Sequence, residues 1–216
     1  MKKFQPMRLV IFNSLCIGAI LSSGFVPMED GYWERKLQQE RKMNLPVHTI
    51  VQSSYTSCGE AAIAMAYNYA YPETQVTEKE VIKYAAGEGL YTEGKWPYTS
   101  PENMVKIAKH FADTVSTGTV KNADEGLGLL IEKLTGGDPV VIDILVRLGR
   151  PGSGAHFVVV TGIDVTNPKA VKIYFNDPLM GKNRWSYWYG SDGLWNGWQN
   201  NGDPGGAGWW MMISSL

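Results

Sequence analysis

Cysteine is scarce in this chain, with two residues among 216. Two cysteines cannot build a fold held by several disulfides, whereas a hydrophobic fraction of 44% is enough for one packed domain. An excess of either charge is also lacking, because 20 basic and 21 acidic side chains leave a net charge of −1 without a basic block. No metal-ligand spacing or cofactor fingerprint is visible. We therefore expect one globular domain with no nucleic-acid partner, no metal and no cofactor.

Long hydrophobic runs are missing except at the N-terminus. Met1–Arg8 is positively charged, Leu9–Leu21 is mostly apolar, and Ser22–Gly24 supplies small residues for signal-peptidase cleavage. The polar pair Asn13–Ser14 interrupts the apolar run and disfavours a lasting transmembrane helix. We expect residues 1–24 to be a signal peptide, with an uncleaved membrane anchor as the alternative. Both predict export to the periplasm or the extracellular space, with membrane contact only through this segment.

The remaining chain divides into a linker and a domain. Residues 25–46 are charged and end at Pro46, which predicts a linker with a short solvated helix, and residues 47–216 form the domain. Removal of residues 1–24 leaves Cys58 as the only cysteine. A lone thiol cannot form an internal disulfide, so Cys58 is either packed or reactive.

The hydrophobic period changes from helical to extended along this domain, which predicts an α+β fold with a helical first half. Capping signals set the helix starts, among them a Thr-x-x-Glu box at Thr77 and a cap at Asp124. Two aromatic-rich segments, 87–100 and 182–208, are predicted as loops; their aromatics either fill the core or grip a peptide or sugar. The expected helices are 58–69, 77–87, 100–111 and 124–134, and the expected strands are 140–146, 157–161, 171–175 and 209–213.

Cys58 begins the first of these helices and is the candidate nucleophile. Ser57 and Glu60 match a Ser-x-x-Glu capping box that would make Cys58 the first helical residue. The positive end of the helix and its unpaired N–H groups favour a thiolate there. Those N–H groups, with the side-chain amide of Gln52, can also stabilise an oxyanion. One short segment thus offers a nucleophile and the donors that its transition state needs.

The candidate base is His156. His110 lies at a helix end, where a cation has a structural role, and His48 is predicted to be structural. His156 instead follows the flexible run Gly152–Ala155 and begins an apolar strand, so a rigid element would hold it at a cleft.

A catalytic histidine also needs a carboxylate that orients its ring. Asp177 ends the strand after that of His156, and antiparallel pairing would place both residues at the same edge of the sheet. Asp143 lies in the middle of a strand and Asp164 at the far end of the histidine's own strand, so both are less well placed. Asp177 has a structural alternative, because a turn residue before proline needs no catalytic role.

Three motifs together resemble the bacteriocin-processing cysteine peptidases, which are papain-like enzymes that cut leader peptides after a double glycine. The motifs are Gln52–Gly59, Ala155–Asp164 and Tyr174–Pro178, and the similarity extends over residues 47–215. The resemblance implies a papain-like fold and a peptidase acting on a peptide or protein substrate. An amidase or acyltransferase acting on cell-wall or other peptides, and a non-catalytic binding domain, remain alternatives. The site residues that it implies are Gln52 in the oxyanion hole, Cys58 as nucleophile, His156 as base and Asp177 as its orienting residue.

Overall fold

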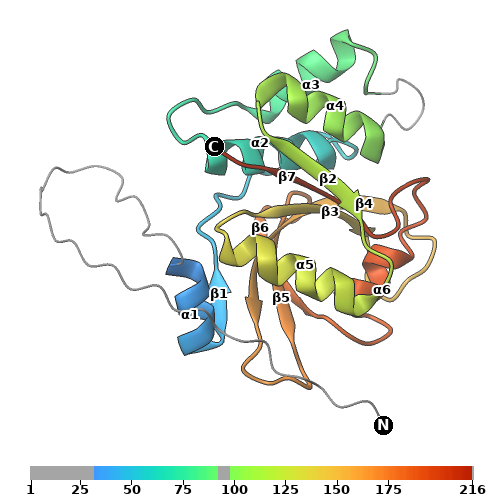
Figure 1. The fold of residues 1–216 in the computed structure, drawn as a ribbon. Helices are drawn as coiled ribbons and strands as arrows, with labels where there is room; N and C mark the ends of the chain where they lie inside the picture. The colour runs from blue at the N-terminus through green and yellow to red at the C-terminus, as the bar shows by residue number, and fades with distance from the viewer. Residues whose placement is uncertain (1–31, 92–97, 216) are drawn as a thin grey trace, which may run out of the picture.

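The computed structural model describes residues 32–91 and 98–215 (Figure 1). The predicted α+β architecture is confirmed, because most helices precede most strands. The expected signal peptide at residues 1–24 and residues 92–97 of an expected loop lie outside the described residues. In the two described ranges, no helix combines the length and hydrophobicity needed to cross a membrane.

The helices are α1 (Tyr32–Glu40), α2 (Cys58–Ala70), α3 (Glu78–Gly87), α4 (Pro101–Phe111), α5 (Ala123–Thr135) and α6 (Leu194–Gln199); the strands are β1 (Lys42–Asn44), β2 (Val115–Thr119), β3 (Val140–Leu145), β4 (Ala155–Asp164), β5 (Lys172–Asp177), β6 (Lys182–Tyr187) and β7 (Trp209–Ile213).

The strands form one antiparallel sheet in the order β2–β7–β3–β4–β5–β6, with β1 paired to β4 outside this path. Figure 1 shows α2, α3 and α4 grouped at one end of the molecule, while α5 lies against the sheet lower in the view. Both α2 and α5 contact β3 and β4. This cover explains why all of β3 and nearly all of β4 are buried, and why both strands are continuous apolar runs in the sequence.

The structured domain begins earlier than the sequence indicated. Residues 42–44, expected in a linker, form β1 and pair with residues 162–164 of β4. Strand β3 pairs with β4 only as far as Val160, so β1 occupies the part of β4 that β3 does not cover. Met43 is buried in the core, so this segment belongs to the domain. Gly162 permits the close approach, since a Cβ there would overlap the Met43 backbone. The charged run before β1 forms α1, as its composition suggested.

Small residues let α2 pack closely between the sheet and two other helices. Its alanines from Ala61 to Ala66 are fully buried, and the helix contacts β4, α3 and α4. Burial on several sides explains why its apolar pattern is nearly continuous. The helix that begins with Cys58 is therefore anchored along its length.

The predicted cap of α3 is confirmed, whereas that of α5 differs. Thr77 caps α3 in the expected box with Glu80, and Ser100 caps α4 by accepting from the Asn103 N–H. The predicted cap of α5 at Asp124 is wrong: the side chain of Asn122 accepts from the N–H groups of residues 124 and 125. Asparagine is as good a cap as aspartate, so sequence alone did not separate them.

The aromatic-rich segment 182–208 is more ordered than a loop. It contains β6, which pairs with β5, and the short helix α6. Trp188 and Trp198 are fully buried and pack against each other with ring centroids 6.2 Å apart. The interpretation that these tryptophans fill the core holds for this pair, whereas Trp185 on β6 is exposed.

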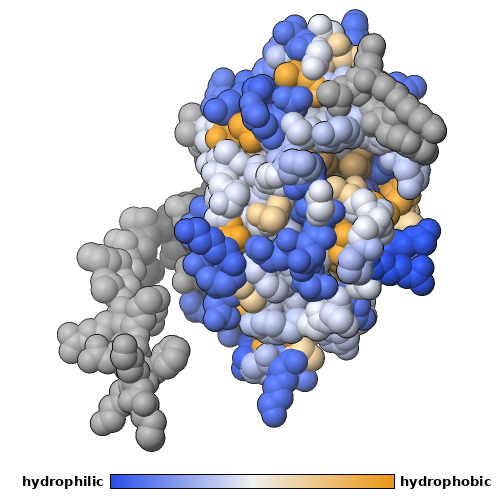
Figure 2. All heavy atoms as spheres, turned by 90° about the vertical axis from the view of Figure 1, so that its right-hand side faces the viewer, coloured by the Kyte–Doolittle hydropathy of each residue, from blue (hydrophilic) through white to orange (hydrophobic). Residues whose placement is uncertain are grey.

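Some large apolar side chains are exposed to solvent. On the face drawn in Figure 2, hydrophobic residues appear as small patches among hydrophilic ones. The exposed large apolar residues include Tyr55, Tyr98, Leu179 and Met180, all of which line the two cavities described below. Solvent-facing apolar area is therefore present at the candidate site.

Candidate active site

Cys58 is the first residue of α2, as predicted, and its thiol is free and half-buried. The following residue, Gly59, brings the sheet close to it. A Cβ at position 59 would lie 2.6 Å from the sulfur of Met104 and 3.3 Å from the ring of Phe157. Because Phe157 follows His156 in β4, the absence of a side chain at Gly59 allows the strand bearing the candidate base to approach the thiol.

The expected capping box at this helix is wrong. Ser57 is the N-cap residue, but its side chain makes no cap hydrogen bond. Its hydroxyl donates instead to Glu78 of α3 over 2.6 Å, and the Glu60 carboxylate accepts from the hydroxyl of Thr99. Tertiary partners have therefore replaced the local pairing, and Ser57 gives α2 no side-chain cap.

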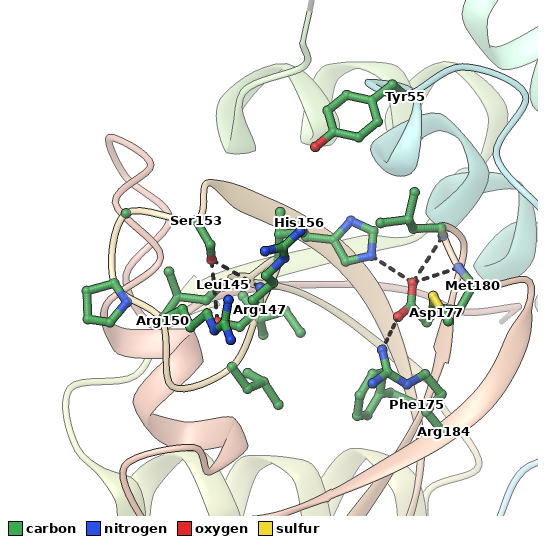
Figure 3. A pocket seen from close by; sticks show the side chains of 16 residues that line it. Tyr55, Leu145, Arg147, Arg150, Ser153, His156, Phe175, Asp177, Met180 and Arg184 are labelled. Atoms are coloured by element: carbon green, nitrogen blue, oxygen red, sulfur yellow. Dashed lines mark hydrogen bonds and ion pairs between the residues drawn. The ribbon is translucent and has the colours of Figure 1, made fainter.

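His156 lies near the start of β4 and is buried. Its backbone N–H donates to Asp143 Oδ1 over 3.1 Å, which links β4 to β3. Its ring Nε2 is 2.9 Å from Asp177 Oδ1 (Figure 3). The antiparallel pairing of β4 with β5 thus brings His156 and Asp177 together, as the strand order predicted.

Asp177 receives donors from three directions. Its Oδ1 accepts from the backbone N–H groups of Leu179 and Met180 at 3.0 and 3.3 Å, and its Oδ2 accepts from Arg184 at 2.7 Å (Figure 3). Burial opposes the charge of Asp177, but the hydrogen bonds from His156 and Arg184 outweigh it and lower its pKa to about 2. Asp177 is therefore ionised at neutral pH.

The environment of His156 favours the imidazolium form. Burial lowers the pKa of the ring, but the hydrogen bonds to Asp177 and to the Cys58 sulfur outweigh that effect and raise the pKa to about 9. Since Nε2 faces Asp177, the other ring nitrogen, Nδ1, is left for Cys58. Thiol, imidazole and carboxylate therefore follow one another, and the imidazole–carboxylate contact is a hydrogen bond of 2.9 Å.

The two rival carboxylates do not meet the His156 ring. Asp143 contacts only the backbone of His156, and burial together with the nearby Asp203 raises its pKa well above the usual value. Asp164 bonds to Thr166 at the far end of β4. Of the other histidines, His110 stacks on Tyr84 near the end of α4, with ring centroids 3.6 Å apart.

Gln52 lies in the loop before Cys58, next to the turn that follows Asp177. Its backbone N–H donates to Pro178 O over 3.0 Å. Its amide Nε2 donates to Ser54 O at 2.7 Å and to Tyr55 O at 2.9 Å, so both amide hydrogens have loop acceptors. Its Oε1 is buried and has no partner among the described residues. The Gln52 side chain therefore lies in the loop before Cys58, and its amide donates to that loop and not toward the thiol.

Two cavities flank the Cys58–His156 pair, and Tyr55 lines both. The larger, of about 810 Å³, is lined by His156, Asp177 and the β3–β4 loop. The smaller, of about 350 Å³, is lined by Cys58, Gly59 and residues 201–204. Figure 3 shows Tyr55 across the larger cavity from Arg184. The candidate base and the candidate nucleophile therefore each line one of two cavities that share Tyr55.

Sequence reasoning missed Glu78 and Arg184 at this site. Glu78 accepts from the Ser53 N–H and the Ser57 hydroxyl, and so ties α3 to the loop before Cys58. Arg184 was missed because residues 182–208 were expected to be a loop. A β5–β6 hairpin at Asp177–Lys182 would have indicated its position opposite Phe175, beside Asp177.

A thiol at a helix start, met by a histidine and an aspartate from an antiparallel sheet, defines the papain-like class of cysteine peptidase-related proteins. The chain belongs to the Peptidase_C39 like family, whose family model matches residues 44–204. A search of curated proteins found no match. The family assignment agrees with the fold and with a function related to cysteine peptidases.

Proposed function

We propose that the protein is a cysteine peptidase in which Cys58 is the nucleophile, His156 the acid and base, and Asp177 the residue that orients His156. The observation that carries the proposal is the 2.9 Å hydrogen bond between the His156 ring and Asp177, together with the thiol of Cys58 at the start of α2, whose sulfur contributes to the raised pKa of His156. A buried histidine with a pKa of about 9 can act as a proton donor at neutral pH. The family assignment supports the same chemistry.

In this mechanism the Cys58 thiolate attacks the carbonyl carbon of a peptide bond and a C–S bond forms. The His156 imidazolium gives its proton to the leaving amine as the C–N bond breaks, which leaves a thioester. A water molecule then attacks the thioester, His156 takes its proton, and the C–S bond breaks to release the acid. Asp177 holds the ring and stabilises its charged form throughout.

Gln52 and the backbone N–H of Cys58 are the proposed oxyanion donors. The Gln52 amide hydrogens bond to the carbonyls of Ser54 and Tyr55, so this role requires the amide to turn toward bound substrate. Its Oε1 has no partner among residues 32–91 and 98–215, so the turn breaks no hydrogen bond on that side. Such rearrangement on substrate binding is common for catalytic hydrogen bonds.

The proposed substrate is a peptide or protein that lies across both cavities. The smaller cavity adjoins Cys58 and would hold the acyl part, while the larger adjoins His156 and would hold the leaving part.

Residues 1–24 support a further proposal, that the protein acts after export. Sequencing the N-terminus of the protein from a periplasmic or culture fraction tests that, and a start at Met1 in the cytosol would contradict it.

The direct test treats the wild type and Cys58→Ala with a thiol-reactive electrophile and a diverse peptide library. We expect rapid labelling at Cys58 and cleavage by the wild type, whereas Cys58→Ala should cleave no peptide and be labelled at most at Cys16, with unchanged circular dichroism. Cleavage retained in Cys58→Ala would contradict the mechanism. Mass spectrometry of the trapped acyl-enzyme with added amines distinguishes hydrolysis from acyl transfer. If the Cys58 thiol of the wild type reacts with the electrophile no faster than an ordinary exposed thiol, the protein is a non-catalytic binding domain.

A further inference from the structure

The larger cavity carries an unbalanced positive charge. Arg147, Arg150 and Arg184 line it, and among the described residues its one carboxylate is that of Asp177. That carboxylate is already bound by His156, Arg184 and two backbone N–H groups. Neither Arg147 nor Arg150 has an ion-pair partner among the described residues. Two guanidinium groups therefore remain available to an incoming anion.

The loop that carries both arginines has a defined backbone. It joins β3 to β4, and Val146 N–H donates to Gly154 O over 2.9 Å at its base. Within it, the Ser153 hydroxyl accepts from Arg147 N–H at 3.1 Å, and Arg150 N–H donates to Arg147 O at 3.0 Å. These bonds hold the two arginines on the same short turn, as Figure 3 shows beside His156.

The chemistry fixes which part of a substrate meets this cavity. His156 must deliver its proton to the leaving amine, so the residues after the scissile bond lie on the His156 side. The larger cavity contains His156 but not Cys58, while the smaller contains Cys58 but not His156. The arginines therefore face the leaving-group half of the peptide.

We propose that Arg147 and Arg150 select peptides that carry an acidic side chain just after the scissile bond. The inference rests on the proposed peptidase function and adds the class of substrate. A guanidinium offers paired N–H donors that match a carboxylate, and the apolar side chains of Leu148, Leu179 and Met180 can contact the stem of a glutamate. Exposed charge pairs are individually weak, so the expected selectivity is moderate.

The test uses peptides that share one acyl half and differ only after the scissile bond, with Glu, Gln or Lys at each of the first two positions. For the full-length wild type we expect kcat/KM for the best Glu peptide to exceed that of its Gln partner by about three- to tenfold. In Arg147→Gln/Arg150→Gln that ratio should fall to about one. The control Lys121→Gln/Lys169→Gln removes the same charge from exposed lysines outside the cavity and should keep the wild-type ratio.

A binding measurement separates this inference from the proposed hydrolysis. The same peptides are titrated calorimetrically into Cys58→Ala and into Cys58→Ala with both arginines changed to glutamine. A Glu preference lost with the arginines supports the inference, even where the wild type cleaves none of the peptides and the peptidase proposal fails. Equal binding of Glu and Gln peptides, a preference for Lys, or a Glu preference that survives the arginine changes would overturn it.

Discussion

The helical and sheet sides of the candidate site hold their reactive groups differently. On the sheet side, strand pairing places His156 and Asp177; a buried hydrogen bond to Asp143 further fixes His156, and a part-buried one from Arg184 further fixes Asp177. On the helical side, Cys58 follows a loop that side-chain contacts hold, with Glu78 as the main acceptor. The candidate base is therefore positioned by the fold itself, whereas the candidate nucleophile and Gln52 depend on a few bonds that single substitutions can break.

The largest effect is expected on the sheet side, from Asp177→Asn. Asparagine keeps the shape but not the charge that stabilises imidazolium, so kcat/KM should fall about 10²- to 10⁴-fold. Peptide cleavage measures the fall in kcat/KM, and thermal unfolding measures the effect of the lost charge on stability. Asp164→Asn is the matched control, because that carboxylate lies at the far end of β4, away from the His156 ring. Equal activity of the two variants would remove Asp177 from the mechanism.

On the helical side, Gln52→Ala should lower kcat about 10²- to 10³-fold if the amide turns to stabilise the oxyanion. The fold should persist, because Gln52 is half-buried in a loop. Gln75→Ala, at an exposed position, is the control. A loss of only about tenfold, as expected for a residue that merely orders the loop, would show that Gln52 contributes no oxyanion donor.

A smaller effect is expected from Glu78→Gln. The amide that replaces one carboxylate oxygen would oppose either the Ser53 N–H or the Ser57 hydroxyl, so the loop before Cys58 should shift. We expect kcat to fall about tenfold with a nearly unchanged KM, since misplacement affects the reacting atoms most. Glu80→Gln alters the cap of the same helix and should lower the unfolding temperature slightly without changing kcat. Identical kinetics for both variants would argue against a positioning role for Glu78.

The same contrast explains how much the sequence could predict. Strands β3 and β4 are buried apolar runs and β5 carries the apolar stretch Ile173–Phe175, so their existence and antiparallel order could be inferred, and with them the meeting of His156 and Asp177. The loop before Cys58 has no such period. Its hydrogen bonds to Glu78, and the turning of Ser57 and Glu60 away from a local capping box, depend on tertiary partners 21 and 39 residues away.

Arg184 and the β5–β6 hairpin show a second limit. Strand β6 is almost entirely exposed and carries Lys, Asn, Arg and Ser, so it lacks the buried alternation that marks a strand. Its partner β5 supplies the register instead. The residue that anchors Asp177 was therefore hidden in a segment expected to be a loop.

The pKa shifts give this account a pH window. For Asp177 the folded pKa of about 2 lies below the ordinary 3.8, so its stabilisation is present above pH 3.8 and is lost as pH falls through 2. For His156 the folded pKa of about 9 lies above the ordinary 6.5, so its stabilisation is complete below pH 6.5 and is lost as pH rises through 9. The stabilisation from the ion pair should therefore be complete from about pH 4 to 6.5, and the pair itself should persist in the folded protein between about pH 2 and 9.

The most direct test of the account is the titration of the His156 ring by NMR, with His156→Gln used to assign its signals among the three histidines. We predict that the wild-type ring titrates near pH 9, and that its pKa falls in Cys58→Ala and in Asp177→Asn because each removes a partner that stabilises the imidazolium. A wild-type ring that titrates at or below 6.5, unchanged in both variants, would contradict the thiol–imidazole–carboxylate chain.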